Sequence, residues 1–177
     1  MRYIALLRGI NVGKTKWVEM KRLKSLFESL GFADVATYIN SGNVFFESDE
    51  KQPAIHTKIE SSLKNEFGFE IPLLVKTEAE IRHIAEAIPE HWHNDPEQKT
   101  DVAYLFDKID SEDIIEKLPV KREYMDIRYV KGAILWNVSR ENYNKSRLNK
   151  LIGHEFYPFM TVRNVNTARF LAGMGKK

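Results

Sequence analysis

The segment from Arg8 to Lys16 has the composition of an anion-binding loop. It reads RGINVGKTK and places two glycines, an asparagine and three cations directly after a short apolar run. Backbone N–H groups in such a loop can converge on a phosphate or carboxylate, and the cations supply the opposite charge. The ending Gly13-Lys14-Thr15 is similar to that of a Walker A phosphate loop. However, three residues separate Gly9 from Gly13, whereas that motif needs four, so we expect a different loop.

Polar side chains in other predicted turns extend this set of candidates. Asparagine both donates and accepts hydrogen bonds, and arginine can bind phosphate or carboxylate through two parallel hydrogen bonds. Asparagine and serine also close turns and cap helices, so a purely structural role stays open for each of them. The predicted ligand-binding residues are Arg8, Asn11, Lys14, Lys16, Asn40, Ser41, Asn43, Arg163, Asn164 and Asn166.

Several other kinds of site are excluded or disfavoured by the sequence. The absence of cysteine excludes disulfides, thiolate-ligated metals and a cysteine nucleophile. His91 and His93 have an H-x-H spacing, but no third ligand is defined, and we interpret them as surface histidines. Ser41 lacks the Gly-x-Ser-x-Gly context of a nucleophile elbow. We therefore predict no metal and no cofactor, and we assign no catalytic residue.

Charge is distributed unevenly along the chain. Residues 1–27 and residues 139–177 each carry a net charge of +6, whereas residues 28–138 carry −10, and the total is +2. If the two basic ends meet in space, they form a positive surface that suits an anion. The alternative is that both ends contribute only solvated basic helix faces.

Hydrophobic periodicity predicts the elements that must position these residues in the first half of the chain. Asn40–Asn43 is typical of a hairpin turn, glycines follow both helical patterns, and Pro72 favours an edge strand. The predicted elements are a strand at residues 3–7, a helix at 20–30, strands at 35–39 and 44–46, a helix at 55–67 and a strand at 71–75.

The second half repeats this pattern after a connecting segment. Thr77 and Glu80 form a capping-box pattern that opens a helix ending near Ile88, and the polar residues 89–99 are typical of a linker. The elements predicted beyond it are a strand at residues 102–106, a helix capped by Ser111 and ending at 118, strands at 125–129 and 133–138, a helix at 148–152, a strand at 159–162 and a last helix at 167–172.

Both halves therefore have the order βαββαβ, which predicts an α+β fold of two ferredoxin-like subdomains with mainly antiparallel sheets. The predicted boundaries are residues 1–76 and 100–177, with a connecting helix and linker at 77–99. We expect the first and third strands of each sheet to be central. We also expect the loop after the first strand and the first hairpin turn to lie at opposite ends of the subdomain. A shared pocket would then need the Arg163 segment of the second subdomain.

Three segments resemble a known family: ALLRGINVG at residues 5–13, TYINSGNV at 37–44 and TVRNVNT at 161–167. The family is widespread in bacteria, is catalogued as a domain of unknown function and opens with the motif ALLRGINVGG. The resemblance covers essentially the whole chain and implies two ferredoxin-like subdomains, but no activity, cofactor or catalytic residue. The chain departs from the family's usual residues at Lys14, Asn40 and Val165.

Three hypotheses of function follow. The first is a small anionic ligand, phosphate- or nucleotide-like, bound between the subdomains. The second is an RNA-binding module, since Tyr3, Tyr38, Phe45 and Phe46 could form a stacking platform on a sheet, although core packing is favoured for the phenylalanines. The third is an interaction protein that forms homo-oligomers through an edge strand such as residues 123–130. Because no apolar run is long enough to cross a bilayer and the N-terminus lacks a signal-peptide layout, we expect a soluble cytoplasmic protein with no membrane partner.

Overall fold

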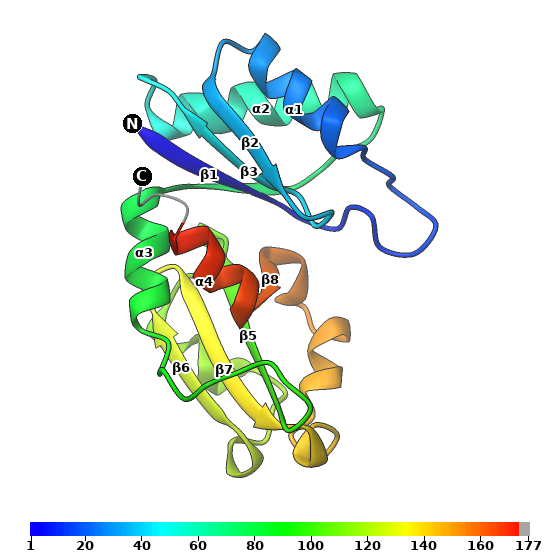
Figure 1. The fold of residues 1–177 in the computed structure, drawn as a ribbon. Coiled ribbons are helices and arrows are strands. Elements are labelled where there is room, and N and C mark those ends of the chain that lie inside the picture. Colours follow the sequence, from blue (N-terminus) through cyan, green and yellow to red (C-terminus); the bar gives the residue numbers. More distant parts are fainter. Residues whose placement is uncertain (174–177) are drawn as a thin grey trace. The chain divides into compact units, whose positions relative to one another are not determined.

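A computed structural model describes residues 1–173 of the chain, which divides into two compact units. The first unit comprises Met1–Ala79, and the second begins at Glu80, inside helix α3 (Glu78–Glu86). Figure 1 shows the elements of each unit. Those of the first are β1 (Arg2–Leu7), α1 (Met20–Ser29), β2 (Ala33–Tyr38), β3 (Asn43–Glu47), α2 (Gln52–Phe67) and β4 (Leu73–Thr77).

The first unit is one antiparallel sheet in the order β2-β3-β1-β4, with α1 and α2 packed on one of its faces (Figure 1). The first and third strands are central, as predicted, and β4 with its preceding Pro72 is an edge. The α2 helix ends where expected, at Gly68 with φ 78°, whose N–H donates to the carbonyl of Lys64. The order of helices and strands in this unit is therefore as its apolar periodicity predicts.

Aromatic side chains fill the core between this sheet and its helices. The Phe46 ring lies 4.7 Å from that of Phe32 and 5.7 Å from that of Tyr3, measured between centroids. Tyr3 and Phe46 belong to this core and Phe45 does not, but all three are at least 97% buried. The alternative in which these rings form an exposed stacking platform is therefore wrong, because the apolar burial of three rings outweighs any use of them at the surface.

The second unit has the same strand order. Its sheet runs β6-β7-β5-β8, again antiparallel throughout, so that its first and third strands are central and β6 is an edge. The α+β class with two antiparallel sheets is confirmed. After α3, the elements are β5 (Gln98–Leu105), η1 (Asp107–Ile109), η2 (Glu112–Lys117), η3 (Arg122–Tyr124), β6 (Asp126–Val130), β7 (Ala133–Ser139), η4 (Arg140–Asn142), η5 (Leu148–Gly153), η6 (Tyr157–Phe159), β8 (Met160–Asn164) and α4 (Val165–Gly173), where η denotes a 3₁₀-helix.

The two helices predicted at residues 111–118 and 148–152 are 3₁₀-helices rather than α-helices. Ser111 makes no capping bond to the backbone, and Pro119 prevents the helix from continuing past Leu118. Arg147 has φ 60°, a left-handed conformation directly before Leu148 that prevents an α-helix from entering from the preceding turn. One face of the second sheet is consequently covered by short, irregular turns.

Strand β5 begins at Gln98, four residues before the predicted start at Val102. Its polar first half pairs with the end of β7, where Gln98 lies opposite Ser139 and Thr100 opposite Asn137. Trp92, inside the predicted linker, is 1% exposed. Residues 89–99 thus include packed and paired positions, because cross-strand hydrogen bonds replace the apolar alternation that sequence periodicity detects. Every helix within residues 1–173 is too short or too polar to span a lipid bilayer.

Candidate functional site

The conspicuous motifs of the first unit meet at one end of its sheet. The N–H of Leu7, the last residue of β1, donates to the carbonyl of Gly42 at 2.8 Å, and Leu6 pairs with Asn43. The expectation that the loop after β1 and the β2–β3 turn lie at opposite ends is wrong. Because β1 runs antiparallel to β3, the end of β1 lies beside the start of β3.

Asn11 joins these two segments through its side chain. Its Nδ2 donates to the carbonyls of Val18 (2.9 Å) and Asn40 (2.8 Å), and its Oδ1 accepts from the N–H of Val18 at 2.7 Å. Asn43 is fully buried, and its Nδ2 donates to the Tyr38 carbonyl and to Ser41 Oγ. These predicted ligand-binding amides therefore hold the turns in place.

The loop after β1 is a small hairpin. Val12 and Thr15 form a β-bridge, and the N–H of Asn11 donates to the Lys16 carbonyl at 3.1 Å. Helix α1 begins at Met20, so the cations of the loop do not stand at a helix N-terminus as they would in a phosphate loop. Lys14 and Lys16 are exposed, and Arg8 is half-buried.

Gly42 allows the β2–β3 turn to pack against this loop. Its φ is 82°, and a Cβ atom there would lie 2.7 Å from Leu7 Cβ and 2.8 Å from Ile10 Cδ1. Only glycine fits this position, both for its backbone conformation and for the space available.

Arg163 lies in β8 and is 6% exposed. Its Nη1 donates to Thr161 Oγ1 at 2.8 Å and to the carbonyl of Val162 at 3.0 Å. Burial lowers the pKa of Arg163 to about 10, partly opposed by the nearby Tyr104, so the guanidinium stays charged at neutral pH. Burial also raises the pKa of Tyr104, whose hydroxyl makes no hydrogen bond among the residues described.

The remaining two predicted ligand-binding residues, Asn164 and Asn166, lie at the junction of β8 and α4. Asn164 Oδ1 accepts from the N–H of Thr167 at 3.0 Å in the first turn of α4, and Asn166 is exposed. That Arg8 and Arg163 face a common cavity stays a prediction.

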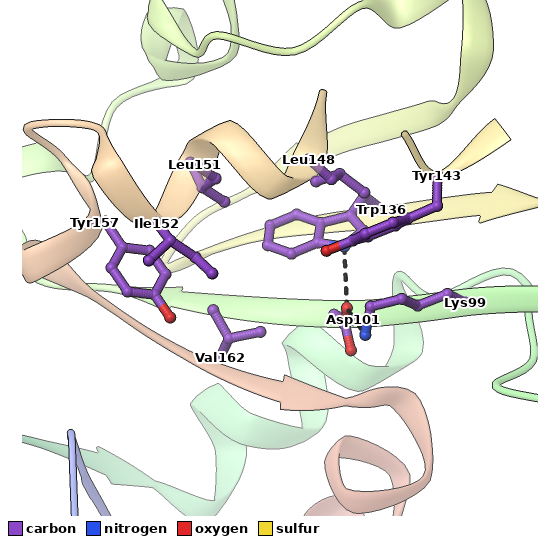
Figure 2. A pocket seen from close by; sticks show the side chains of 9 residues that line it. All are labelled: Lys99, Asp101, Trp136, Tyr143, Leu148, Leu151, Ile152, Tyr157 and Val162. Atoms are coloured by element: carbon purple, nitrogen blue, oxygen red, sulfur yellow. Dashed lines mark hydrogen bonds and ion pairs between the residues drawn. The ribbon is translucent and has the colours of Figure 1, made fainter. Parts of the chain in front are cut away.

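A cavity of about 150 Å³ lies on the face of the second sheet that is covered by η5 and η6 (Figure 2). Its apolar wall comes from the 3₁₀ segments that replace the predicted helix, and its polar side comes from the first half of β5. The lining residues are Lys99, Asp101, Trp136, Tyr143, Leu148, Leu151, Ile152, Tyr157 and Val162.

Asp101 is the acidic group of this cavity and is 5% exposed. Its Oδ2 accepts from Lys99 Nζ at 2.9 Å and from Trp136 Nε1 at 3.2 Å. In the part of the chain that the structure describes, Oδ1 of Asp101 accepts no hydrogen bond from any side chain. Three aromatic rings share the site, since Tyr143 and Tyr157 line it together with Trp136 (Figure 2).

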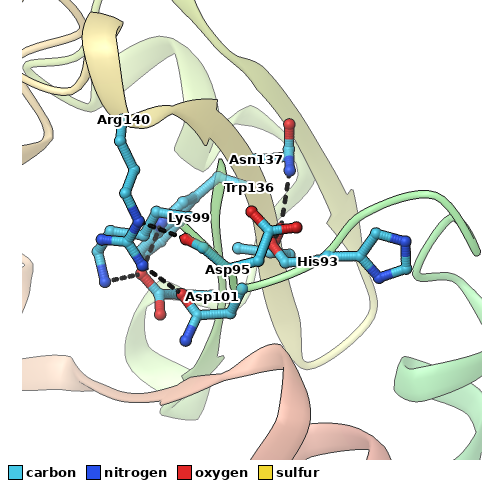
Figure 3. A network of polar contacts seen from close by, with 9 residues as sticks. His93, Asp95, Lys99, Asp101, Trp136, Asn137 and Arg140 are labelled. Carbon is cyan, nitrogen blue, oxygen red and sulfur yellow. Dashed lines mark hydrogen bonds and ion pairs between the residues drawn. The ribbon is translucent and has the colours of Figure 1, made fainter. Parts of the chain in front are cut away.

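A polar network holds the start of β5, and with it Asp101, against the end of β7 (Figure 3). Arg140 Nε donates to the Asp95 carbonyl at 2.6 Å, and Asn137 Nδ2 donates to Gln98 Oε1 (2.6 Å) and Thr100 Oγ1 (2.8 Å). The N–H of Gln98 is the main cause that lowers the pKa of Asp95, whose Oδ1 accepts from it at 2.8 Å. The site is thus placed by a rigid, hydrogen-bonded turn.

No pattern in the sequence indicates this cavity. The polar residues 89–99 are typical of a linker, and Tyr143 and Tyr157 belong to no motif. The available signal was Asp101 itself, a carboxylate that directly precedes an apolar strand. Within residues 1–173, no group of three or more histidine, aspartate or glutamate side chains is arranged to hold a metal ion.

Comparison with known proteins identifies the family. A family model described as "Protein of unknown function (DUF1697)" matches residues 1–136. The chain belongs to this family. The match includes Lys99, Asp101 and Trp136 but ends before the segment that supplies Tyr143 and Tyr157. The family resemblance indicated by the motifs is thereby confirmed.

A solved structure extends the similarity to nearly the whole chain. The conserved bacterial protein SP0830 from Streptococcus pneumoniae is 28% identical in sequence, with a TM-score of 0.86. The alignment covers 99% of this chain and 98% of that one. No curated protein matches the chain significantly.

Proposed function

We propose that the second unit binds a small ring-shaped molecule that donates a hydrogen bond to Asp101. The observation that carries this proposal is a carboxylate, 5% exposed, that lines a cavity and whose Oδ1 accepts no hydrogen bond from any side chain of residues 1–173. A ligand N–H or O–H that donates to Oδ1 makes a charge-assisted hydrogen bond, which is stronger than one between neutral groups. Oδ1 is therefore the acceptor that the cavity offers to a ligand.

The size and lining of the cavity specify the ligand further. A cavity of about 150 Å³ is large enough for benzene, so the ligand is about one ring in size. The rings of Trp136, Tyr143 and Tyr157 favour an aromatic or cationic group, by stacking or cation–π attraction. A buried negative charge at Asp101 disfavours an anion. The ligand chemistry is therefore a neutral or cationic ring that bears an N–H or O–H group.

An anionic, phosphate- or nucleotide-like ligand remains the second candidate, at a different place. Arg163 carries a buried positive charge, and the Tyr104 hydroxyl beside it has a free donor. An anion would accept hydrogen bonds from both groups. This candidate needs Arg163 rather than Asp101, so the two can be separated by mutation.

Thermal shift and tryptophan fluorescence with aniline, phenol and imidazole test the first candidate. The Asp101→Asn variant should bind these probes about 10- to 150-fold more weakly, since a hydrogen bond to a charged group contributes about 1.5–3 kcal/mol. Asp126→Asn removes an exposed acid from β6 and serves as the matched control. Probe binding that is equal in the wild type and Asp101→Asn would contradict the proposal.

Phosphate and nucleotides in the same assay test the second candidate. Arg163→Ala should lose the increase in Tm with phosphate that Asp101→Asn keeps. Tyr104→Phe, which removes only the unpartnered hydroxyl, should weaken the effect without loss of fold. If both variants keep the wild-type shift, the anion site does not exist.

A further inference from the structure

Three large apolar side chains are exposed at one end of the first sheet. Val12 is 72% exposed, Trp17 70% and Ile39 47%. The segments that carry them are joined by the hydrogen bond from Asn11 Nδ2 to the Asn40 carbonyl. Exposed apolar side chains that lie together in this way mark interaction surfaces. We call Val12, Trp17 and Ile39, with the cations of the hairpin loop, the Trp17 surface.

The backbone of the Trp17 surface is strained. Ile39 has φ 51°, a left-handed conformation that is strongly disfavoured for a β-branched residue. This conformation places an apolar side chain at the surface rather than in the core. Strain of this kind persists where the surrounding structure enforces it and is concentrated at functional sites.

The loop and the β2–β3 turn carry only positive charge, and the first acidic residue beyond them is the exposed Glu19, two positions after Trp17. Neither residues 1–18 nor residues 35–46 contain an acidic residue. Lys14 and Lys16 are exposed, and among residues 1–173 neither forms an ion pair or side-chain hydrogen bond. An exposed indole therefore directly follows a loop that carries two exposed lysines, with the half-buried Arg8 at the base of the same loop.

We propose that the Trp17 surface binds single-stranded nucleic acid, with a base stacked on Trp17 and phosphates held by Lys14 and Lys16. Aromatic rings interleaved with cations are the means by which proteins bind single strands without sequence preference. The proposal is independent of the cavity in the second unit. It assigns RNA binding to the hairpin loop after β1 rather than to the face of the sheet, because Tyr3, Phe45 and Phe46 are buried.

The shape of the loop favours a nucleic acid over a membrane. Gly13 and Lys14 form the tip of the hairpin, between the bridged residues Val12 and Thr15. Insertion of the tip into lipid would bury the Lys14 ammonium group, which is costly. A strand of nucleic acid instead places a phosphate at this tip and a base against the ring beside it.

Fluorescence anisotropy with a labelled, mixed-sequence RNA of about ten nucleotides tests the proposal on the full chain. With Lys14 and Lys16 as contacts, log K should fall with log salt with a slope of about −1.4. Lys14→Gln should reduce the slope by about 0.7. Lys51→Gln, an exposed lysine beyond the other end of β3, should leave it unchanged.

Trp17 supplies a second readout because the other two tryptophans, Trp92 and Trp136, are 1% and 3% exposed. Stacking should quench the Trp17 emission in parallel with the change in anisotropy. Trp17→Ala should weaken RNA binding about 5- to 150-fold, and Trp17→Phe should retain part of the affinity.

Three results would overturn the proposal. These are no RNA binding at low salt, equal affinity in Trp17→Ala, or quenching that does not involve Trp17. Vesicles that contain phosphatidylserine serve as a competing partner. A blue shift of Trp17 with these vesicles, together with absent RNA binding, would assign the surface to a membrane instead.

Discussion

The two units order their strands identically but cover them differently. In the first unit, α1 and α2 place continuous apolar stripes on the sheet, through residues such as Leu23 and Leu63. At the equivalent positions of the second unit stand the 3₁₀-helices η2 and η5. A short 3₁₀-helix cannot present such a stripe, and the cavity lies beneath η5. The same strand order is therefore compatible with different covering layers, and the type of helix in that layer determines whether a cavity forms above the sheet.

The largest expected effect comes from one substitution made in both covering layers. Leu63 in α2 is fully buried in the core, whereas Leu151 in η5 borders the cavity. Within the range of about 2–5 kcal/mol known for Leu→Ala, Leu63→Ala should lie near the top and Leu151→Ala near the bottom. The reason is that Leu151 already lacks neighbours on one side.

Equilibrium urea unfolding, monitored by circular dichroism, measures the free energy of unfolding of both variants. The comparison between the units fails if Leu151→Ala is as destabilising as Leu63→Ala. That result would mean that the 3₁₀ layer is packed as densely as the α-helical one.

The next effect distinguishes structural from functional asparagines. Asn11→Ala removes three hydrogen bonds and forces alanine into a conformation with φ 54°, so the free energy of unfolding should fall by about 2–3 kcal/mol. Asn166→Ala, at an exposed position, should change it by less than about 0.5 kcal/mol. Calorimetric Tm values of both variants measure this difference. If Asn11→Ala leaves the Tm unchanged, Asn11 is not a structural residue and a ligand-binding role becomes the better explanation.

The smallest effect concerns Asp110, which ties η1 to the β6–β7 turn. Its Oδ1 accepts from the Tyr129 hydroxyl and the Gly132 N–H, both at 2.9 Å, and its Oδ2 from Lys131 Nζ at 2.8 Å. Burial acts to raise the pKa of Asp110, but the hydrogen bond from Lys131, followed by those from Gly132 and Tyr129, outweighs it and leaves the pKa below its usual value.

A lowered pKa in the folded state stabilises the protein above the pKa of the unfolded chain, and that contribution is lost as the pH falls below about 4. Asp110→Asn should therefore cost about 1 kcal/mol at neutral pH and flatten the acid side of the Tm–pH profile. Parallel profiles for the variant and the wild type would show that packing, rather than this polar tie, holds the 3₁₀ layer.

The sequence was informative where apolar periodicity is strong. The runs at residues 3–7 and 102–106 correctly predicted central strands, and Gly68 correctly predicted the end of α2. Periodicity did not distinguish α-helix from 3₁₀-helix around Leu148, because the left-handed backbone at Arg147 leaves no apolar signature.

The candidate site was harder to predict for a related reason. The asparagine-rich motifs predict ligand contacts, but the side-chain amides of Asn11 and Asn43 donate hydrogen bonds to backbone carbonyls of neighbouring residues. Asp101, Tyr143 and Tyr157 lie far apart in the sequence, and only tertiary packing brings them together around the cavity. Motif spacing describes local turns well and long-range cavities poorly.

The central position of β1 has a consequence for biosynthesis. This strand leaves the ribosome before β3 and β4, the two strands that flank it. Its apolar residues Tyr3–Leu7 must therefore wait, with both edges open, until Leu73–Thr77 has been translated. Because open strand edges promote aggregation, the nascent first unit is most prone to aggregate during the interval before β4 is translated.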